Sequence, residues 1–248
     1  MKNFFLNHQN DFVVEIFSIY HFLFILLVFL FVCLVINNKE KFINLEKSKQ
    51  KKLRYILFFI LLINFILRRG SFIYYDVYNY KFHLDINFCN FTSILFMIYC
   101  ITGNKKIYTI CYYMTFVGPL LSILFPSVNI TPLNYSFYSF IILHHVLFIF
   151  NIMFMYMENL KYNRNAFIKV IIFIFIYLIV TWIFNLFFKT TYNSPLTFIS
   201  NSLNEIIPFY SLNQFEATIV MYVVIMICLF VGKGFMKILN NYNKVIAV

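Results

Sequence analysis

Residues 166–188 read AFIKVIIFIFIYLIVTWIFNLFF, a run in which Lys169 is the only charged side chain. A helix needs about 20 apolar residues to cross a hydrocarbon core of about 30 Å, and this run is long enough. The whole chain has the same character, since 62% of its 248 residues are hydrophobic, 35 are Phe and only 12% are charged. So few charges cannot cover a water-exposed surface. The composition therefore predicts an all-α, multispanning membrane protein.

Further apolar stretches of similar length predict a polytopic bundle of about seven helices, which we expect to form one membrane domain over residues 1–248. In the second stretch Arg68 and Arg69 interrupt the apolar run, so its helix could end before them. The expected spans are about 14–37, 55–75, 84–103, 107–125, 137–157, 166–188 and 213–232.

Basic residues are distributed unevenly along the chain. Lys and Arg collect in short loops on the cytoplasmic side of a membrane. Residues 38–54 hold seven basic and two acidic residues, and more basic residues follow the third, fifth and seventh spans. This alternation predicts a multi-pass protein of the cell membrane with its N-terminus outside and its C-terminus in the cytoplasm. The net charge of +11 then reflects topology and attraction to anionic headgroups, and no nucleic-acid partner is required.

Some kinds of site are disfavoured by the sequence. The first residues, MKNFFLNHQNDFVVE, place polar and acidic groups ahead of the first apolar run, which is not typical of a removed signal peptide. The five cysteines fall within or at the ends of spans, and neither CxxC nor HExxH occurs. We therefore expect no disulfide framework, no metal and no cofactor, and the oligomeric state is left open.

Four hydrogen-bonding side chains from four spans fall in one layer of the predicted bundle. At about 1.5 Å of rise per residue, Cys89, His144 and His21 lie roughly 8–11 Å below the outer boundary, and Asn185 lies near the outer end of its span. Polar residues in a membrane usually face the bundle interior, where they join helices or mark a functional path. A lone cysteine is most simply a small hydrophobe, but a nearby histidine can take its proton and create a nucleophile.

Several motifs follow one another in the order and spacing of a known family. These are FSIYH (17–21), LDINFCN (84–90), FVGPLLSILFPS (116–127), FYSFIILHH (137–145), an intramembrane Asn185 and SLNEIIPFY (202–210). On these residues the chain resembles the YwaF-like bacterial integral membrane proteins and their animal relative, a membrane acyltransferase acting on polyunsaturated ether phospholipids. The resemblance implies that Cys89 matches the cysteine of an L-x-x-H-x-C-N stretch, His144 the histidine of an F-I-x-H element, and His21 a histidine in the first span. Asn87 stands where many relatives have histidine.

Shared depth and resemblance together favour a lipid acyltransferase or acyl hydrolase that acts on membrane phospholipids from the outer leaflet. Cys89 would be the nucleophile and His144 the general base. Asn90, His21 or Asn185 would orient the histidine or donate a hydrogen bond to an oxyanion. The expected depth of the site is close to that of glycerol ester carbonyls.

Arg68 and Arg69 are candidates for binding a lipid phosphate, because guanidinium groups bind phosphate through paired hydrogen bonds. The simpler interpretation is that both are interfacial arginines whose charged ends reach toward water.

A function of another class fits the same polar layer, namely a small-solute transporter or a substrate-binding membrane subunit. Gly118 and Pro119 could break the fourth span, as in the discontinuous helices of transporter sites. No internal repeat relates the two halves of the chain, which counts against a transporter. A scaffold or assembly protein fits the basic 38–54 segment equally well.

Overall fold

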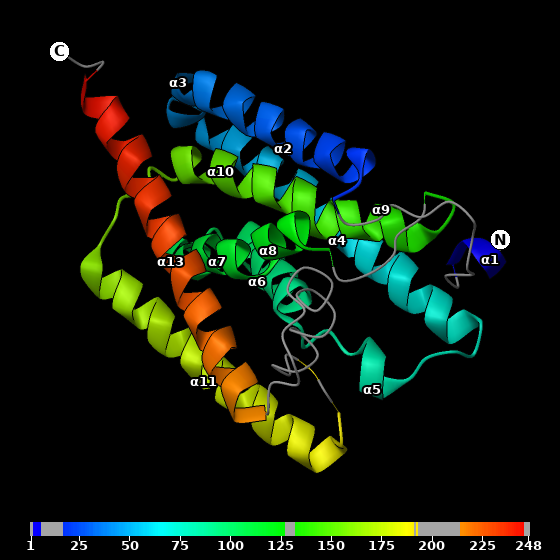
Figure 1. Ribbon diagram of the computed structural model, residues 1–248. Coiled ribbons are helices and arrows are strands. Elements are labelled where there is room, and N and C mark those ends of the chain that lie inside the picture. Colours follow the sequence, from blue (N-terminus) through cyan, green and yellow to red (C-terminus); the bar gives the residue numbers. More distant parts are fainter. Residues whose placement is uncertain (1, 6–16, 127–131, 191, 193–213, 246–248) are drawn as a thin grey trace.

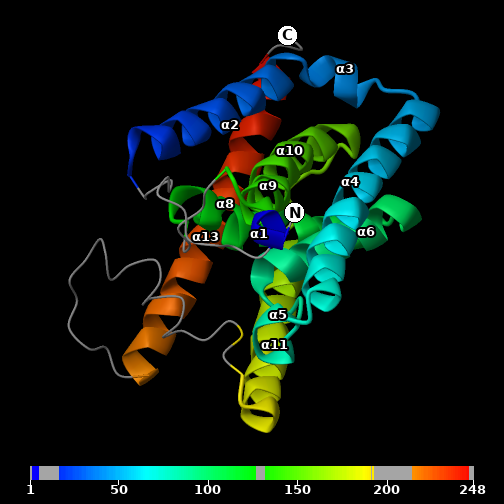
Figure 2. The same ribbon diagram turned by 90° about the vertical axis from the view of Figure 1, so that its right-hand side faces the viewer.

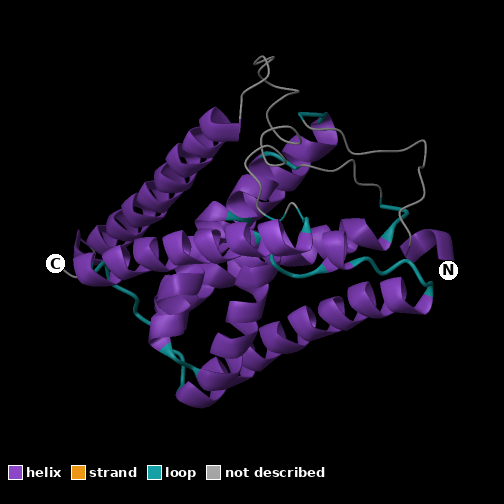
Figure 3. Cartoon of the chain, turned by 90° about the horizontal axis from the view of Figure 1, so that it is seen from below, coloured by secondary structure: helices purple, strands orange, loops and turns teal. Residues whose placement is uncertain are grey.

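The computed structural model describes residues 2–5, 17–126, 132–190, 192 and 214–245, and every regular element among them is a helix (Figures 1 and 3). The helices are α1 Lys2–Phe5, α2 Ile19–Asn37, α3 Lys39–Ile43, α4 Lys47–Tyr74, α5 Tyr80–His83, α6 Phe88–Thr102, α7 Lys105–Val117, α8 Pro119–Leu124, α9 Tyr135–Ile141, the π-helical turn η1 Ile142–Val146, α10 Leu147–Met157, α11 Arg164–Phe188 and α13 Gln214–Val245.

Six helical stretches of the described chain are long and apolar enough to cross a membrane: α2, α4, α7 with α8, α9 through α10, α11 and the apolar part of α13. The remaining expected span is α6, which has 15 residues and therefore a length of about 22 Å. The prediction of an all-α polytopic bundle is thus confirmed. The third span is shorter than the sequence suggested.

Several helix boundaries differ from the expected ones. α4 ends at Tyr74, close to the expected end at about residue 75 and without a stop at Arg68 and Arg69, but it begins at Lys47, inside the basic segment. α13 runs on to Val245, well past the end of its apolar stretch. The fourth span is divided at Gly118 into two helices: α7 ends at Val117, and α8 begins at Pro119. The start of the first expected span and the SLNEIIPFY stretch lie outside the described residues.

An aromatic core fills the centre of the bundle, where α6 and α7 pack against α10. The rings of Tyr99 and Tyr108 are fully buried and lie 4.8 Å apart between centroids, and both contact Phe154. In Figure 1, α6, α7 and α8 occupy the middle, with α2, α4 and α10 on one side and α11 and α13 on the other. Figure 2 shows α3 bridging the ends of α2 and α4. The outer helices expose many Leu, Ile and Phe side chains, as lipid-facing helices do.

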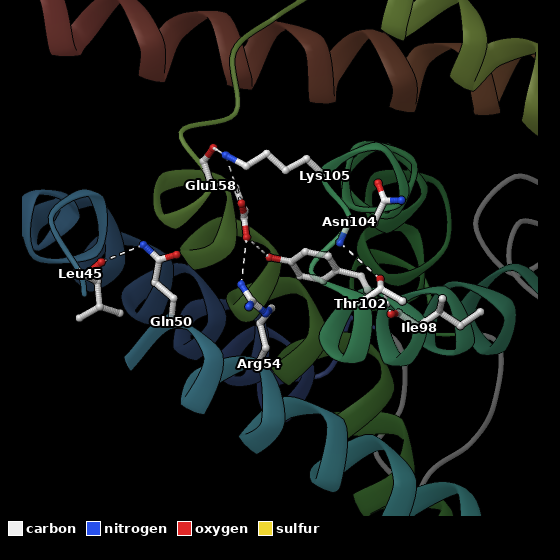
Figure 4. A network of polar contacts seen from close by, with 9 residues as sticks. Leu45, Gln50, Arg54, Ile98, Thr102, Asn104, Lys105 and Glu158 are labelled. Carbon is white, nitrogen blue, oxygen red and sulfur yellow. Dashed lines mark hydrogen bonds and ion pairs between the residues drawn. The ribbon is translucent and has the colours of Figure 1, made fainter. Parts of the chain in front are cut away.

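A buried carboxylate joins four helices at the end of the bundle that is predicted to be cytoplasmic (Figure 4). The side chain of Glu158 is 5% exposed and accepts a 2.7 Å hydrogen bond from Tyr99 Oη on α6. Its oxygens also lie 3.3 Å from Arg54 Nη1 on α4 and 3.3 Å from Lys105 Nζ on α7. Two cations and a hydroxyl thus compensate a carboxylate that burial would otherwise make very costly.

Candidate functional site

Cys89 lies in the first turn of α6. Asn87 is the N-cap with extended backbone, so the helix begins at Phe88, later than the sequence indicated. The segment before it is held from α11, because Tyr177 Oη donates a hydrogen bond to Ile86 O. Tyr192 Oη accepts a 2.8 Å hydrogen bond from Leu84 N. These contacts place the thiol at the start of the helix instead of one turn inside it.

The break in the fourth span brings α8 against this thiol. Cys89 Sγ lies 3.4 Å from Ser122 Oγ, within hydrogen-bonding distance for sulfur. A Cβ on Gly118 would lie 3.3 Å from Sγ and 3.2 Å from Cys89 N, so only glycine fits without movement. The Gly118–Pro119 break therefore allows the close approach that gives Cys89 its polar neighbour.

Two features favour the thiolate form of Cys89. The amino end of a helix carries partial positive charge, which stabilises an anion in the first turn. The guanidinium of Arg68 also interacts electrostatically with Cys89. Burial in apolar surroundings is the larger influence and acts in the opposite direction, because it disfavours any charge. A base that removes the thiol proton is therefore needed for the thiol to act as a nucleophile.

His144 is buried in the π-helical turn η1, a type of turn that is frequent at functional sites. Its Nδ1 lies 2.8 Å from the carbonyl oxygen of Phe140. A carbonyl can only accept, so Nδ1 carries the proton and Nε2 of the neutral ring is left with the free lone pair. No described residue hydrogen-bonds to Nε2. This tautomer is the one that a general base acting through Nε2 requires.

No hydrogen bond joins Cys89 to His144 within the described residues. The two side chains belong to one neighbourhood, because η1 packs against α6 and α8. Arg68 interacts electrostatically with both.

Two of the expected supporting residues are engaged elsewhere. His21 Nδ1 accepts a 3.1 Å hydrogen bond from Phe17 N, and its Nε2 lies 2.9 Å from Ile123 O. Both ring nitrogens of His21 therefore have partners, and the ring ties α2 to α8. Asn185 closes the turn after α11: its Oδ1 accepts from Thr190 Oγ1 at 2.7 Å, and its Nδ2 donates to Tyr192 O at 2.7 Å. Among the described residues, neither side chain forms a hydrogen bond with His144.

Asn90, Arg68 and Arg69 lie together beside the cysteine. Arg68 Nη1 donates to Asn90 Oδ1 at 3.4 Å, which leaves the amide nitrogen of Asn90 as the end without a described partner. Arg69 differs from its neighbour, because it forms a two-pronged ion pair with Asp85 through Nε and Nη2. Within the described chain, no cluster of three His, Cys, Asp or Glu side chains is arranged to hold a metal ion.

Comparison with known proteins identifies the family. The sequence profile of the TMEM164 family matches residues 15–235. The chain belongs to the TMEM164 family. No curated protein and no solved structure matches the chain. TMEM164 is a membrane protein family, which is consistent with the resemblance drawn from the sequence. The YwaF-like designation stays a prediction.

The structure adds residues to the site of this TMEM164 family member that the sequence did not single out. Among the described residues, Ser122 is the one whose side chain hydrogen-bonds to Cys89, and Asn64 lies near Arg68 in a shared cleft. Ser122 follows Gly118 by four residues and therefore lies on the same helical face. The expected break at Gly118 and Pro119 thus pointed to the part of the chain that contains Ser122. The support from Tyr177 and Tyr192 joins positions 91 and 108 residues apart in sequence, and no local pattern indicates such contacts.

Proposed function

We propose that the protein is a thiol-dependent lipid acyltransferase or acyl hydrolase of the cell membrane that acts on phospholipids from the outer leaflet. The observation that carries the proposal is the placement of Cys89 in the first turn of α6, with Ser122 Oγ at 3.4 Å and the charge of Arg68 nearby. A thiol that serves only for packing needs none of these groups. An acyl-accepting thiolate is stabilised by all of them.

In the proposed reaction, His144 Nε2 takes the proton of the Cys89 thiol, and the thiolate attacks the carbonyl carbon of a lipid ester. The tetrahedral oxyanion is stabilised by the first-turn amides of α6 and by Asn90 Nδ2. It collapses with cleavage of the ester C–O bond, and the leaving alcohol receives the proton from the imidazolium. The product is a thioester on Cys89. A lipid hydroxyl or water then attacks this thioester with His144 again as base, which regenerates the thiol.

The separation of Cys89 and His144 in the free protein is compatible with this scheme. Catalytic hydrogen bonds are often long before substrate binds and tighten in the complex. A lipid ester seated between the two side chains would complete the arrangement. His21 and Asn185 act, in this scheme, as structural ties and take no part in proton transfer.

Intact-protein mass spectrometry in liposomes of mixed phospholipids tests the proposal. We expect a fatty-acyl adduct on wild-type protein that hydroxylamine removes, and we expect no adduct on Cys89→Ser or on His144→Ala. Cys33→Ser is the matched control, because Cys33 is a half-buried thiol on α2. Absence of an adduct from wild type across varied lipids, or an adduct that persists in Cys89→Ser, would refute the proposal.

A transporter is the second candidate, because a specific observation favours it: the Gly118–Pro119 break places the end of α7 and the start of α8 inside the bundle. Solute uptake that survives Cys89→Ser but is lost in His144→Ala would support transport. In the acyl-transfer proposal the break has another use, since it brings Ser122 to the thiol.

A further inference from the structure

A small cleft next to Cys89 contains Asn90, which donates to the oxyanion in the acyl-transfer scheme, together with Arg68 and Asn64, which have no hydrogen bond to substrate in that scheme. It opens between α4, α6 and η1, and its lining combines polar and apolar side chains. The lining residues are Leu61, Asn64, Phe65, Arg68, Arg69, Asp85, Asn90, Ser93 and Leu143.

The cleft carries one uncompensated positive charge. Asp85 is the only carboxylate in its lining, and it is already paired with Arg69 through both carboxylate oxygens. Arg68 has no ion pair among the described residues, and its one hydrogen bond goes to the neutral Asn90. A guanidinium held in a membrane bundle without a carboxylate is costly, and a bound anion removes that cost.

The amides of the cleft present donors. Asn64 Oδ1 accepts a 2.9 Å hydrogen bond from Tyr135 Oη, just as Asn90 Oδ1 accepts from Arg68. With both oxygens occupied, the NH₂ group is the remaining end of each amide, and neither has a hydrogen bond within the described part of the chain. The cleft thus combines a free cation with amide donors from two helices. Such a set fits a ligand group rich in oxygen acceptors and negative charge.

An apolar lining residue, Phe65, connects this donor set to the lipid. Phe65 lines the cleft and is also 39% exposed on the outer face of α4, so the cleft borders the lipid-facing surface. Arg68 precedes the end of α4 by six residues, about 9 Å along the helix, a distance that a long arginine side chain largely covers. Arg68 also interacts electrostatically with Cys89 and His144, so the guanidinium belongs to the same neighbourhood as both.

We propose that this cleft is a binding subsite for the phosphate of a phospholipid, with Arg68 as the charged ligand, the amide of Asn64 as an additional donor, and the second N–H of Asn90 Nδ2, the one that does not face the oxyanion, as another. The inference rests on the proposed function in one respect: the ester bond that is attacked belongs to the lipid whose headgroup the cleft binds beside the thiol. Binding itself needs no thiol. The subsite and the chemistry therefore fail or succeed independently.

Equilibrium binding of a radiolabelled short-chain phosphatidylcholine to the purified full-length protein tests the subsite in a Cys89→Ser background, where no acyl transfer occurs. The same measurement with a diacylglycerol of equal chain length removes only the phosphate headgroup. We expect Arg68→Gln to weaken phosphatidylcholine binding by at least about tenfold and to leave diacylglycerol binding unchanged. Lys49→Gln is the matched control, since it removes one charge from the exposed opposite end of the same helix.

Asn64→Asp guards against a folding defect in Arg68→Gln. The aspartate keeps an oxygen for Tyr135 and adds a carboxylate beside Arg68, so we expect it to weaken phosphatidylcholine binding as well. Unchanged phosphatidylcholine affinity in both variants would overturn the proposal. Equal affinity of wild type for diacylglycerol would do the same. Arg68-dependent binding of oleate without binding of phosphatidylcholine would also overturn it, because the anion would then be a carboxylate.

Discussion

Replacing Gly118 by alanine tests the contact between α8 and the first turn of α6. The added Cβ would lie 3.2 Å from Cys89 N, 3.3 Å from Cys89 Sγ and 3.3 Å from the carbonyl carbon of Phe88. Carbon atoms at their best separation are about 3.5–4.0 Å apart, so the helices must separate by a few tenths of an ångström. The φ of Gly118 is −93°, which alanine adopts freely. The effect is therefore steric.

The expected size of the effect follows from two opposing contributions. Glycine to alanine at an unstrained position stabilises a protein by about 0.4–1 kcal/mol. Overpacking a closed contact costs about 1–3 kcal/mol. Two of the three close atoms belong to backbone and cannot rotate away, so the cost prevails. We expect Gly118→Ala to be destabilised by about 0.5–2 kcal/mol.

Gly234→Ala is the matched control, because a Cβ at this position in α13 meets nothing within 4 Å. We expect it to be neutral or more stable by up to about 1 kcal/mol. Reversible unfolding in mixed detergent and SDS micelles measures both variants, and the alkylation rate of Cys89 reports on the local contact. If Gly118→Ala were as stable as Gly234→Ala and its alkylation rate equalled that of wild type, the tight approach of α8 to Cys89 would be wrong.

Three further predictions concern groups around the bundle. Glu158→Ala leaves the mostly buried guanidinium of Arg54 and the buried hydroxyl of Tyr99 without their carboxylate, so we expect a loss of about 3–5 kcal/mol in the same unfolding assay. A loss below about 1 kcal/mol would contradict the network. Burial, with the charges of Arg69 and Arg68, lowers the pKa of His83, which lies outside the spans. The folded state then binds fewer protons than the unfolded chain at low pH. The contribution of His83 to the free energy of unfolding is therefore complete above about pH 6.5 and declines as pH falls below that value. His83→Gln should flatten the dependence of this free energy on pH between about pH 7 and 5. Tyr192→Phe removes the hydroxyl that holds the segment before α6, so amide exchange over residues 84–87 should accelerate by about 5–30-fold, whereas unchanged exchange would show that the hydroxyl does not hold it.

The fold class could be predicted from the sequence because hydropathy is a local property. Residues 166–188 predict a membrane helix by themselves, and α11 covers them. Helix boundaries and side-chain partners were harder to predict where they depend on residues distant in the sequence. Arg68 and Arg69 interrupt the apolar run, yet α4 passes through both and ends near the expected residue 75. Their partners, Asp85 and Asn90, lie 16 and 22 residues away and were not indicated by the sequence. The helical start at Lys47 also lay outside an apolar window, although lysine is a good helix former.

The sequence indicated which residues belong to the candidate site better than it indicated which of them contact one another. Common depth grouped Cys89 with His144 and His21, but depth does not specify direction. The partner of His21 is the carbonyl of Ile123, 102 residues away, which no spacing indicates. The π-helical turn that carries His144 likewise has no local signal among its apolar neighbours. A polar residue in a span predicts that a partner exists, and tertiary packing decides which one it is.

The short α6 gives the site a dependence on the host membrane. Its far end is fixed, because Gly103 caps the helix at φ 62° and Tyr99, one turn earlier, is bonded to Glu158. Because Cys89 lies at the other end of the helix, the length of 15 residues determines how far the thiol lies from this fixed end. Hydrocarbon thickness differs by several ångströms among biological membranes. On the proposed function, a thicker bilayer would place the ester carbonyls farther above Cys89, and a thinner one would bring them closer to it. Acyl-chain length of the surrounding lipid thus becomes a variable that acts on this cysteine without changing any residue.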